Sequence, residues 1–155
     1  MLDSIIDQLT LIFDRVIKLK SDRYAVKSEG YWTIIDNKAN CLSGEHYKDI
    51  ELDNINNFIV TKEANSASLI DFDGNKILKT QYRDLRVLPS GYYIATKKIT
   101  NSITLSGVID YKENEILPFI YVSIGVDDGR LVVFLGSGSR LEYFDFYGKR
   151  ITQGG

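Results

Sequence analysis

Hydrophobic and polar positions follow two different periods along this chain of 155 residues. Over roughly the first 20 residues, apolar side chains recur every three or four positions, which is the spacing of one face of an α-helix. From there onward, short apolar runs alternate with clusters of Gly, Asn, Asp and Ser, a pattern typical of β-strands joined by tight turns. The chain is therefore expected to combine one N-terminal helix with a β-sheet region.

The apolar spacing of the N-terminal segment predicts an amphipathic helix from residue 2 to about residue 20, within a unit of residues 1–22. The apolar positions are Leu2, Ile5, Ile6, Leu9, Ile12, Phe13, Val16 and Leu19. Acidic residues lie near the start of the segment and basic residues near its end, which suits the helix dipole.

We expect this helix to pack on the β-region of the same chain, with Ile5, Leu9, Ile12 and Val16 facing the strands and covering an open edge or end. A helix that dimerises or docks on a partner is the alternative. A membrane-surface helix is disfavoured, because the charges of the segment are balanced rather than cationic.

Four recurring positions organise the β-region. An apolar residue followed by aspartate occurs four times, with the aspartates 35, 39 and 35 residues apart: Asp36, Asp71, Asp110 and Asp145. Six positions after each aspartate lies an aliphatic residue: Leu42, Ile77, Ile116 and Ile151. Eleven positions after the first three lies a tyrosine, and fourteen after them an aliphatic residue: Tyr47, Tyr82 and Tyr121, then Ile50, Leu85 and Ile124. Such a period is typical of units that each bury a face against a neighbour. We therefore expect the aliphatic residues that lie six positions after the aspartates to be buried and equivalent.

Each aspartate is expected to open a β-hairpin turn, because its carboxylate can accept hydrogen bonds from backbone N–H groups two residues on. Gly74 and Gly148 lie three residues after their aspartates, where a short hairpin loop favours a left-handed backbone. Ala39 and Glu113 hold that place in the other two repeats, and an asparagine follows each of them. We expect that asparagine to be the left-handed residue, so these two turns are predicted to differ in detail.

These patterns predict a mainly β fold, an antiparallel meander of about four hairpin repeats and about ten to twelve strands, with one N-terminal amphipathic helix. Residues 23–155 form the repeat region and make a single structural domain with the helix. Because a sheet of this size has to twist and curl, a strongly curved or barrel-like sheet is favoured over a propeller.

The first repeat resembles the WG (KWG) repeat. Residues 30–36 read Gly-Tyr-Trp-Thr-Ile-Ile-Asp, which is similar to the Gly-x-Trp-Gly-x-Ile-Asp core of that family. The matching positions further on are Leu42, Tyr47, Asp49 and Ile50. The second and third repeats keep the frame with Ala67 and Ser106 at the tryptophan position, and the resemblance covers about residues 24–152. It implies an all-β array of hairpins and a role in binding rather than in catalysis.

Composition and charge indicate which classes of partner the protein is expected to bind. The chain is 44% apolar and 26% charged, as is usual for a globular protein, and its net charge of −2 gives no electrostatic basis for nucleic-acid binding. No apolar run approaches the roughly 18–20 residues of a membrane span, and no signal-peptide pattern is visible. Cys41 is the only cysteine; it excludes an internal disulfide, fits a reducing compartment and is expected at a packing or edge position. We therefore expect a cytoplasmic protein with neither nucleic acid nor membrane as a partner.

Candidates for chemistry are few, and each has a structural explanation. His46 is the only histidine, and no serine or cysteine lies in a recognisable nucleophile elbow, so a surface position is favoured. Asp71 and Asp73 resemble a Ca²⁺ loop, but Tyr82 stands where the twelfth loop position requires a glutamate. The sequence therefore predicts a protein that is not an enzyme and that needs no metal and no cofactor.

Acidic residues gather in the first repeat, where residues 24–58 carry six acidic and three basic side chains. Asp49, Glu51 and Asp53 alternate along one predicted strand, so they share a face, and we expect all three to be exposed. They are the candidate docking residues for a basic protein partner. An edge strand kept charged to prevent aggregation is the alternative.

The leading functional hypothesis is a non-enzymatic protein–protein interaction module, in one version an inhibitor or immunity-type protein that blocks a basic partner. The second hypothesis is a small-molecule binder, for example of a carbohydrate. In that case Trp32 and the repeat tyrosines would supply stacking surfaces.

Overall fold

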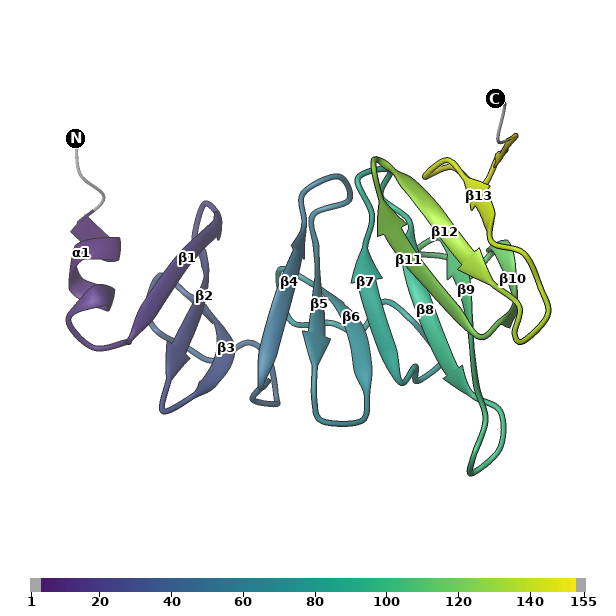
Figure 1. Cartoon of the computed structure of the whole chain (residues 1–155). Helices are drawn as coiled ribbons and strands as arrows, with labels where there is room; N and C mark the ends of the chain where they lie inside the picture. The colour runs from purple at the N-terminus through teal and green to yellow at the C-terminus, as the bar shows by residue number, and fades with distance from the viewer. Residues whose placement is uncertain (1–3, 153–155) are drawn as a thin grey trace.

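The computed structural model describes residues 4–152 as a mainly β protein with one short helix at its N-terminal end (Figure 1). The helix α1 spans Ser4–Thr10. The strands are β1 (Arg15–Lys20), β2 (Arg23–Ser28), β3 (Tyr31–Asp36), β4 (Asp49–Asp53), β5 (Phe58–Lys62), β6 (Ala67–Asp71), β7 (Asp84–Val87), β8 (Tyr93–Lys98), β9 (Thr104–Ile109), β10 (Glu115–Tyr121), β11 (Ser123–Asp127), β12 (Arg130–Phe134), β13 (Glu142–Phe144) and β14 (Arg150–Ile151).

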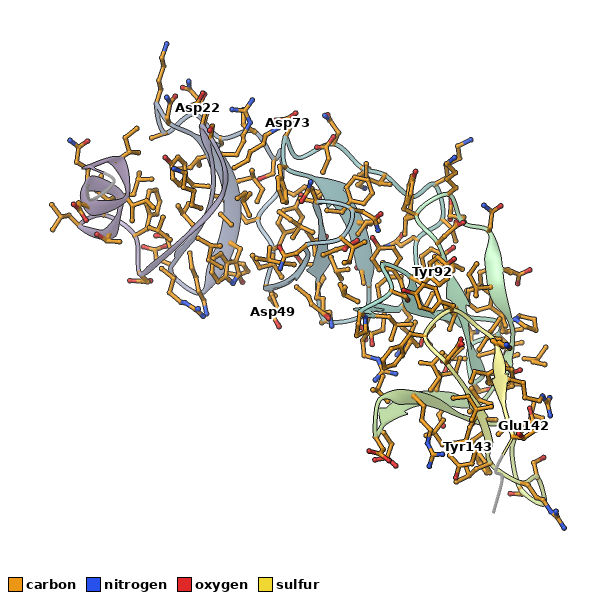
Figure 2. The ribbon with its side chains drawn as sticks, turned by 90° about the horizontal axis from the view of Figure 1, so that it is seen from above. Asp22, Asp49, Asp73, Tyr92, Glu142 and Tyr143 are labelled. Carbon is orange, nitrogen blue, oxygen red and sulfur yellow. The ribbon has the colours of Figure 1, made fainter. Side chains whose placement is uncertain are left out.

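The strands form four antiparallel sheets that stand in a row (Figure 1). In spatial order they are β1-β2-β3, β4-β5-β6, β7-β8-β9-β10 and β11-β12-β13-β14. The row curves when it is seen from above (Figure 2) and does not close into a barrel. The predicted antiparallel meander with a curved arrangement is thus confirmed, but as four small stacked sheets rather than one continuous sheet.

Neighbouring sheets bury apolar side chains between their faces. Because side chains alternate along a strand, Ala25 of β2 packs toward the second sheet, while its neighbours Tyr24 and Val26 pack toward α1. Two further apolar clusters lie between the second and third sheets and between the third and fourth. Each inner sheet is therefore covered on both faces.

Helix α1 covers the outer face of the first sheet. Leu9 is 6% exposed and packs in one cluster with Tyr24, Val26 and Ile35. Ile5 packs against this cluster as predicted. The prediction is wrong for Ile12, which is 71% exposed, because the helix has already ended when the chain reaches it.

Residues 15–20 form strand β1 and not the second half of a helix, so the predicted helix to about residue 20 is wrong beyond Thr10. Positions 1–3 of that prediction lie outside the described residues. Val16, Ile17 and Leu19 fit a helical spacing, but the first two are β-branched and favour a strand. Pairing with β2 satisfies their backbone groups, and Val16 reaches the cluster beneath α1 from the strand.

Strand register confirms that the repeats are equivalent. The residue before each aspartate pairs with the residue five positions after it: Ile35 with Cys41, Ile70 with Lys76, Ile109 with Glu115, and Phe144 with Arg150. The residue four positions before the aspartate pairs with the repeat tyrosine: Trp32 with Tyr47, Ala67 with Tyr82, and Ser106 with Tyr121. All three tyrosines are buried, at 2–5% exposure.

The aliphatic residues six positions after the aspartates are equivalent as predicted but only half-buried. Leu42, Ile77 and Ile116 each pack against the edge of a different inter-sheet cluster. They are not centres of the core because they lie on the short return segment at the margin of each sheet. The tyrosine of the same segment and the apolar residues of the central strands fill the interior instead.

All four aspartate turns share one geometry. In the second repeat, the backbone N–H groups of Asp73 and Asn75 both donate to Asp71 Oδ1 at 2.9 Å, and the other three turns repeat this pair of bonds. The residue three positions after the aspartate is left-handed in every copy, including Ala39 (φ 64°) and Glu113 (φ 66°). The predicted difference between the turns is therefore wrong. The asparagine that follows stays outside the left-handed region and donates its side-chain amide to the aspartate.

Candidate binding grooves between the repeats

Asp53, one of the predicted docking residues, is fully buried at 0% exposure. Its carboxylate accepts hydrogen bonds from the backbone N–H groups of Ile55 (2.9 Å) and Asn56 (3.1 Å) and from the hydroxyl of Tyr93 on β8. The expectation that Asp53 is exposed is wrong, because a partner 40 residues away in sequence satisfies its charge inside the protein.

Glu51 and Asp49 complete the acidic row on β4. Glu51 is half-buried, accepts a hydrogen bond from the backbone N–H of Val87 (3.0 Å), and forms an ion pair with Lys62 (3.3 Å). Asp49 is exposed, and its side chain points away from the ribbon (Figure 2). Glu51 and Asp53 therefore hold the second sheet to the third, and of the three only Asp49, whose Oδ1 accepts from the backbone N–H of Ile50 at 2.9 Å, is exposed to a partner.

Trp32, the other predicted binding residue, is 3% exposed. Arg15 and Lys27 place their cationic groups 5.5 Å and 6.0 Å from the centre of its ring. The indole thus packs in the apolar cluster between the first and second sheets, beneath two cations. The expectation that Trp32 offers a free stacking surface is wrong.

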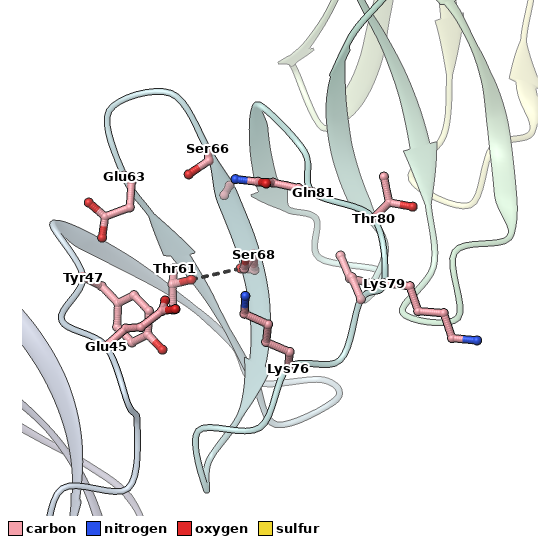
Figure 3. Close-up of a pocket in the computed structure, with 12 residues that line it drawn as sticks. Glu45, Tyr47, Thr61, Glu63, Ser66, Ser68, Lys76, Lys79, Thr80 and Gln81 are labelled. Carbon is pink, nitrogen blue, oxygen red and sulfur yellow. Dashed lines mark hydrogen bonds between the residues drawn. The ribbon is translucent and has the colours of Figure 1, made fainter.

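A polar groove lies between the first and second repeats (Figure 3). It has a volume of about 290 Å³. One wall carries Glu45 and Tyr47 from the return segment of the first repeat. The other walls come from β5, β6 and the return segment of the second repeat: Thr61, Glu63, Ser66, Ala67, Ser68, Lys76, Leu78, Lys79, Thr80 and Gln81. We call this space the acidic groove.

Two carboxylates, Glu45 and Glu63, and two lysines, Lys76 and Lys79, are the charged residues that line the acidic groove. No side-chain hydrogen bond or ion pair joins Glu45 or Glu63 to any residue between 4 and 152. Burial raises the pKa of the Tyr47 phenol, and the charges of Glu45 and Glu63 raise it further, so both carboxylates act on the same buried hydroxyl. Lys76 is the cation that lies in the groove, whereas the ammonium of Lys79 points away from it (Figure 3).

A second, mainly apolar groove of about 340 Å³ lies between the N-terminal segment and the first repeat. Phe13, Tyr31, Ile35, Cys41 and His46 line it. Both His46 and Cys41 are exposed, as the sequence predicts for the histidine. We call this space the apolar groove.

Sequence reasoning missed both grooves. It placed His46 at the surface, counted Glu45 among the acidic residues of the first repeat and did not consider Glu63. Glu45 and Glu63 are 18 positions apart and do not occupy equivalent positions of the repeat, so no pattern in the sequence indicates that they line one groove.

Among residues 4–152, no group of three or more His, Cys, Asp or Glu side chains is arranged to hold a metal ion. The aspartates of the suspected Ca²⁺ loop are engaged otherwise: Asp71 closes its turn, and Asp73 forms an ion pair with Arg23 at 2.6 Å. The helix within residues 4–152 is too short to cross a membrane.

Comparison of the chain with protein-family models, with curated proteins and with solved structures found no match. The resemblance to WG repeats therefore stays a prediction that depends on the spacing of residues in the sequence.

Proposed function

We propose that this protein is a non-enzymatic interaction module that binds a basic segment of another protein in the acidic groove. The observation that carries the proposal concerns Glu45 and Glu63 beside the buried Tyr47: neither carboxylate has a hydrogen-bond or ion-pair partner among residues 4–152. An arginine or lysine side chain is the complement of such a site, since a charge-assisted hydrogen bond to a carboxylate is about twice as strong as a neutral one.

The hydroxyl groups around the groove support the same ligand chemistry. Thr61 donates to the backbone carbonyl of Ser68 at 3.4 Å, while Ser66 lies near the rim of the groove. Asp49 on the neighbouring strand adds an exposed negative charge. Together these groups would raise the association rate with a basic partner, an effect that salt weakens. An immunity-type inhibitor in the cytoplasm is one form of this function.

The test is an NMR titration of the whole protein with two blocked peptides, Gly-Ser-Arg-Ser-Gly and Gly-Ser-Glu-Ser-Gly. We expect the arginine peptide to shift the backbone resonances of Tyr47, Ser68 and Gln81 in a saturable way that weakens with salt. The double variant Glu45→Gln/Glu63→Gln should lose this response. The exposed Glu115→Gln serves as the matched control and should keep it.

Two outcomes would overturn the proposal. One is equal shifts with the glutamate peptide, and the other is binding that the double variant retains. A panel of neutral mono- and disaccharides run on the same protein distinguishes the small-molecule alternative, since saturable shifts at the groove with a sugar and none with the arginine peptide would favour that function.

A further inference from the structure

The acidic groove and the apolar groove share a wall. The return segment from Cys41 to Tyr47, which bends at residues 43–45, separates them. Cys41 and His46 line the apolar groove, whereas Glu45 and Tyr47 line the acidic groove, so one short stretch of backbone presents residues to both grooves. A ligand that crosses this wall contacts both.

The two grooves are also the same feature of two successive repeats. Residues of the apolar groove and of the acidic groove correspond at a spacing of 35 positions: Tyr31 with Ser66, Thr33 with Ser68, Cys41 with Lys76, and His46 with Gln81. One groove therefore lies about one sheet-to-sheet spacing from the other, which is roughly 10 Å for sheets packed face to face. The lining is mainly apolar in the first copy and mainly polar in the second.

In the third repeat the equivalent space is filled. Gly107 and Phe119 stand at the positions of Ser68 and Thr80, and a Cβ on Gly107 would lie 3.1 Å from the Phe119 ring. That ring stacks on Tyr82 with centroids 6.1 Å apart. The ammonium of Lys97, which the strand register places where the second repeat has Glu63, lies 4.2 Å from the centre of the Phe119 ring. The third repeat thus offers neither the space nor the negative charge.

We infer that the two grooves together bind one extended segment of the partner, with an apolar side chain in the apolar groove and an arginine or lysine in the acidic groove. A segment in the extended polyproline II conformation has three residues per turn and advances about 3.1 Å per residue, so side chains three positions apart lie on the same face at roughly the 10 Å separation of the grooves. This inference rests on the proposed function and adds the length, conformation and composition of the segment that is bound.

The first test measures affinity for blocked peptides that carry leucine and arginine separated by two residues, in both orders, Leu-Gly-Ser-Arg and Arg-Gly-Ser-Leu, beside the peptide with arginine alone. One order should bind on the order of tenfold more tightly than arginine alone, because leucine leaves water. Placing six residues between leucine and arginine should abolish the gain. Equal affinity for all the arginine peptides would overturn the two-groove inference and leave the proposed function standing, whereas absence of binding by every arginine peptide would overturn both.

Cys41 supplies a second readout in the unaltered protein, because it is the only thiol of the chain and lines the apolar groove. At equal saturation, the tighter leucine–arginine peptide should slow alkylation of this thiol several-fold, and the arginine peptide should leave the rate unchanged. Equal rates with the two peptides would overturn the inference.

A filled-groove variant separates the two sites. Cys41→Phe should remove the gain from leucine and retain the binding of the arginine peptide. Ser137→Phe, in an exposed loop of the fourth repeat, is the control and should retain both. If Cys41→Phe kept the full affinity for the leucine–arginine peptide, the apolar groove would not be the leucine site.

Discussion

At the scale of single residues, carboxylates and buried phenols connect one sheet to the next. Asp53 of the second sheet accepts from Tyr93 of the third. Glu113 of the third repeat accepts from the Tyr82 hydroxyl at 2.9 Å and from the backbone N–H groups of Lys79 and Thr80. A buried polar group that loses its partner destabilises the folded state by its full desolvation cost, so these contacts hold the sheets in a specific alignment.

Removing the Tyr93 hydroxyl tests the link to Asp53. Tyr93→Phe should lower the free energy of unfolding by about 1.5–3 kcal/mol, the usual range for a hydrogen bond to a charged group. The measurement is urea unfolding followed by circular dichroism. The exposed Tyr31→Phe is the matched control, and equal effects of the two substitutions would contradict the assignment.

The phenol of Tyr82 predicts a stability change at alkaline pH. Burial raises the pKa of Tyr82, and its hydrogen bond to Glu113 raises it further, so the folded-state pKa lies above the ordinary value of about 10. The stabilisation from the neutral phenol is complete below pH about 10 and is lost as the pH rises beyond it, by at most about 1.4 kcal/mol per pH unit.

Urea unfolding from about pH 8 to about pH 11.5, a range that includes the ordinary pKa of tyrosine, measures this effect. The free energy of unfolding of the native chain should fall more steeply above pH about 10 than that of Tyr82→Phe. Parallel curves for the two proteins would show that Tyr82 does not contribute.

At the scale of elements, the aspartate turn is the unit that the four repeats share. Its carboxylate accepts hydrogen bonds from two backbone N–H groups. The residue three positions after the aspartate is left-handed in all four turns, whatever residue stands there. Gly74 and Gly148 suit that conformation and also pack closely: a Cβ on Gly74 would lie 2.9 Å from Ser43 Cα, and one on Gly148 would lie 2.5 Å from Ile116 Cγ2. These two turns therefore dock on the return segment of the preceding repeat.

Replacing the left-handed alanine of the first turn should stabilise the protein. Ala39→Gly relieves the strain of a left-handed alanine and should raise the free energy of unfolding by about 0.5–1 kcal/mol. Ala64→Gly, in a turn without positive φ, is the control and should lower it by about 0.5–1 kcal/mol through the entropy of the unfolded chain. Thermal and urea unfolding measure both, and destabilisation by Ala39→Gly would contradict the turn geometry.

The short helix has one buried side chain that tests its packing. Leu9→Ala should cost about 2–3 kcal/mol in unfolding free energy, because Leu9 fills the space over Tyr24 and Val26. Leu11→Ala, at a position that is 87% exposed, should change stability by less than about 0.5 kcal/mol. Equal effects would show that the helix does not pack on the first sheet in solution.

At the scale of the whole molecule, the four sheets make an extended row in which each sheet contacts only its neighbours (Figure 1). Val132 and Tyr143 on the fourth sheet occupy register positions that are buried between sheets in the earlier repeats, and here both are half-exposed. Among residues 4–152, α1 covers the first sheet and no element covers the outer face of the fourth. The stability of such an array is the sum of its repeats and their interfaces.

The extended row predicts the size of the protein in solution. A compact domain of this length would have a radius of gyration of about 15 Å, and stacking four sheets at roughly 10 Å each should raise it clearly above that value. Small-angle X-ray scattering of the monomer, with the mass checked by light scattering, measures it. A value near 15 Å with a symmetric distance distribution would contradict the open row.

Much of the local structure was predictable from the sequence. The repeat frame, the aspartate turns and the burial of Tyr47, Tyr82 and Tyr121 all follow from residues close together in the chain, where side-chain alternation and turn chemistry act directly. The acidic groove was not predictable, since Glu45 and Glu63 belong to different repeats and meet only after the sheets stack.

Tertiary structure decided where the helix ends, which acidic residues of β4 are buried, and whether the strands form one sheet or several. Val16 and Ile17 suit either a helix or a strand, and the available edge of β2 selects the strand. The sequence predicts Asp53 to be exposed, whereas in the structure Tyr93 of another sheet donates a hydrogen bond to its carboxylate. The same local pattern also allows one closed sheet or several stacked ones, because it specifies which face of a strand is apolar but not which neighbour covers that face.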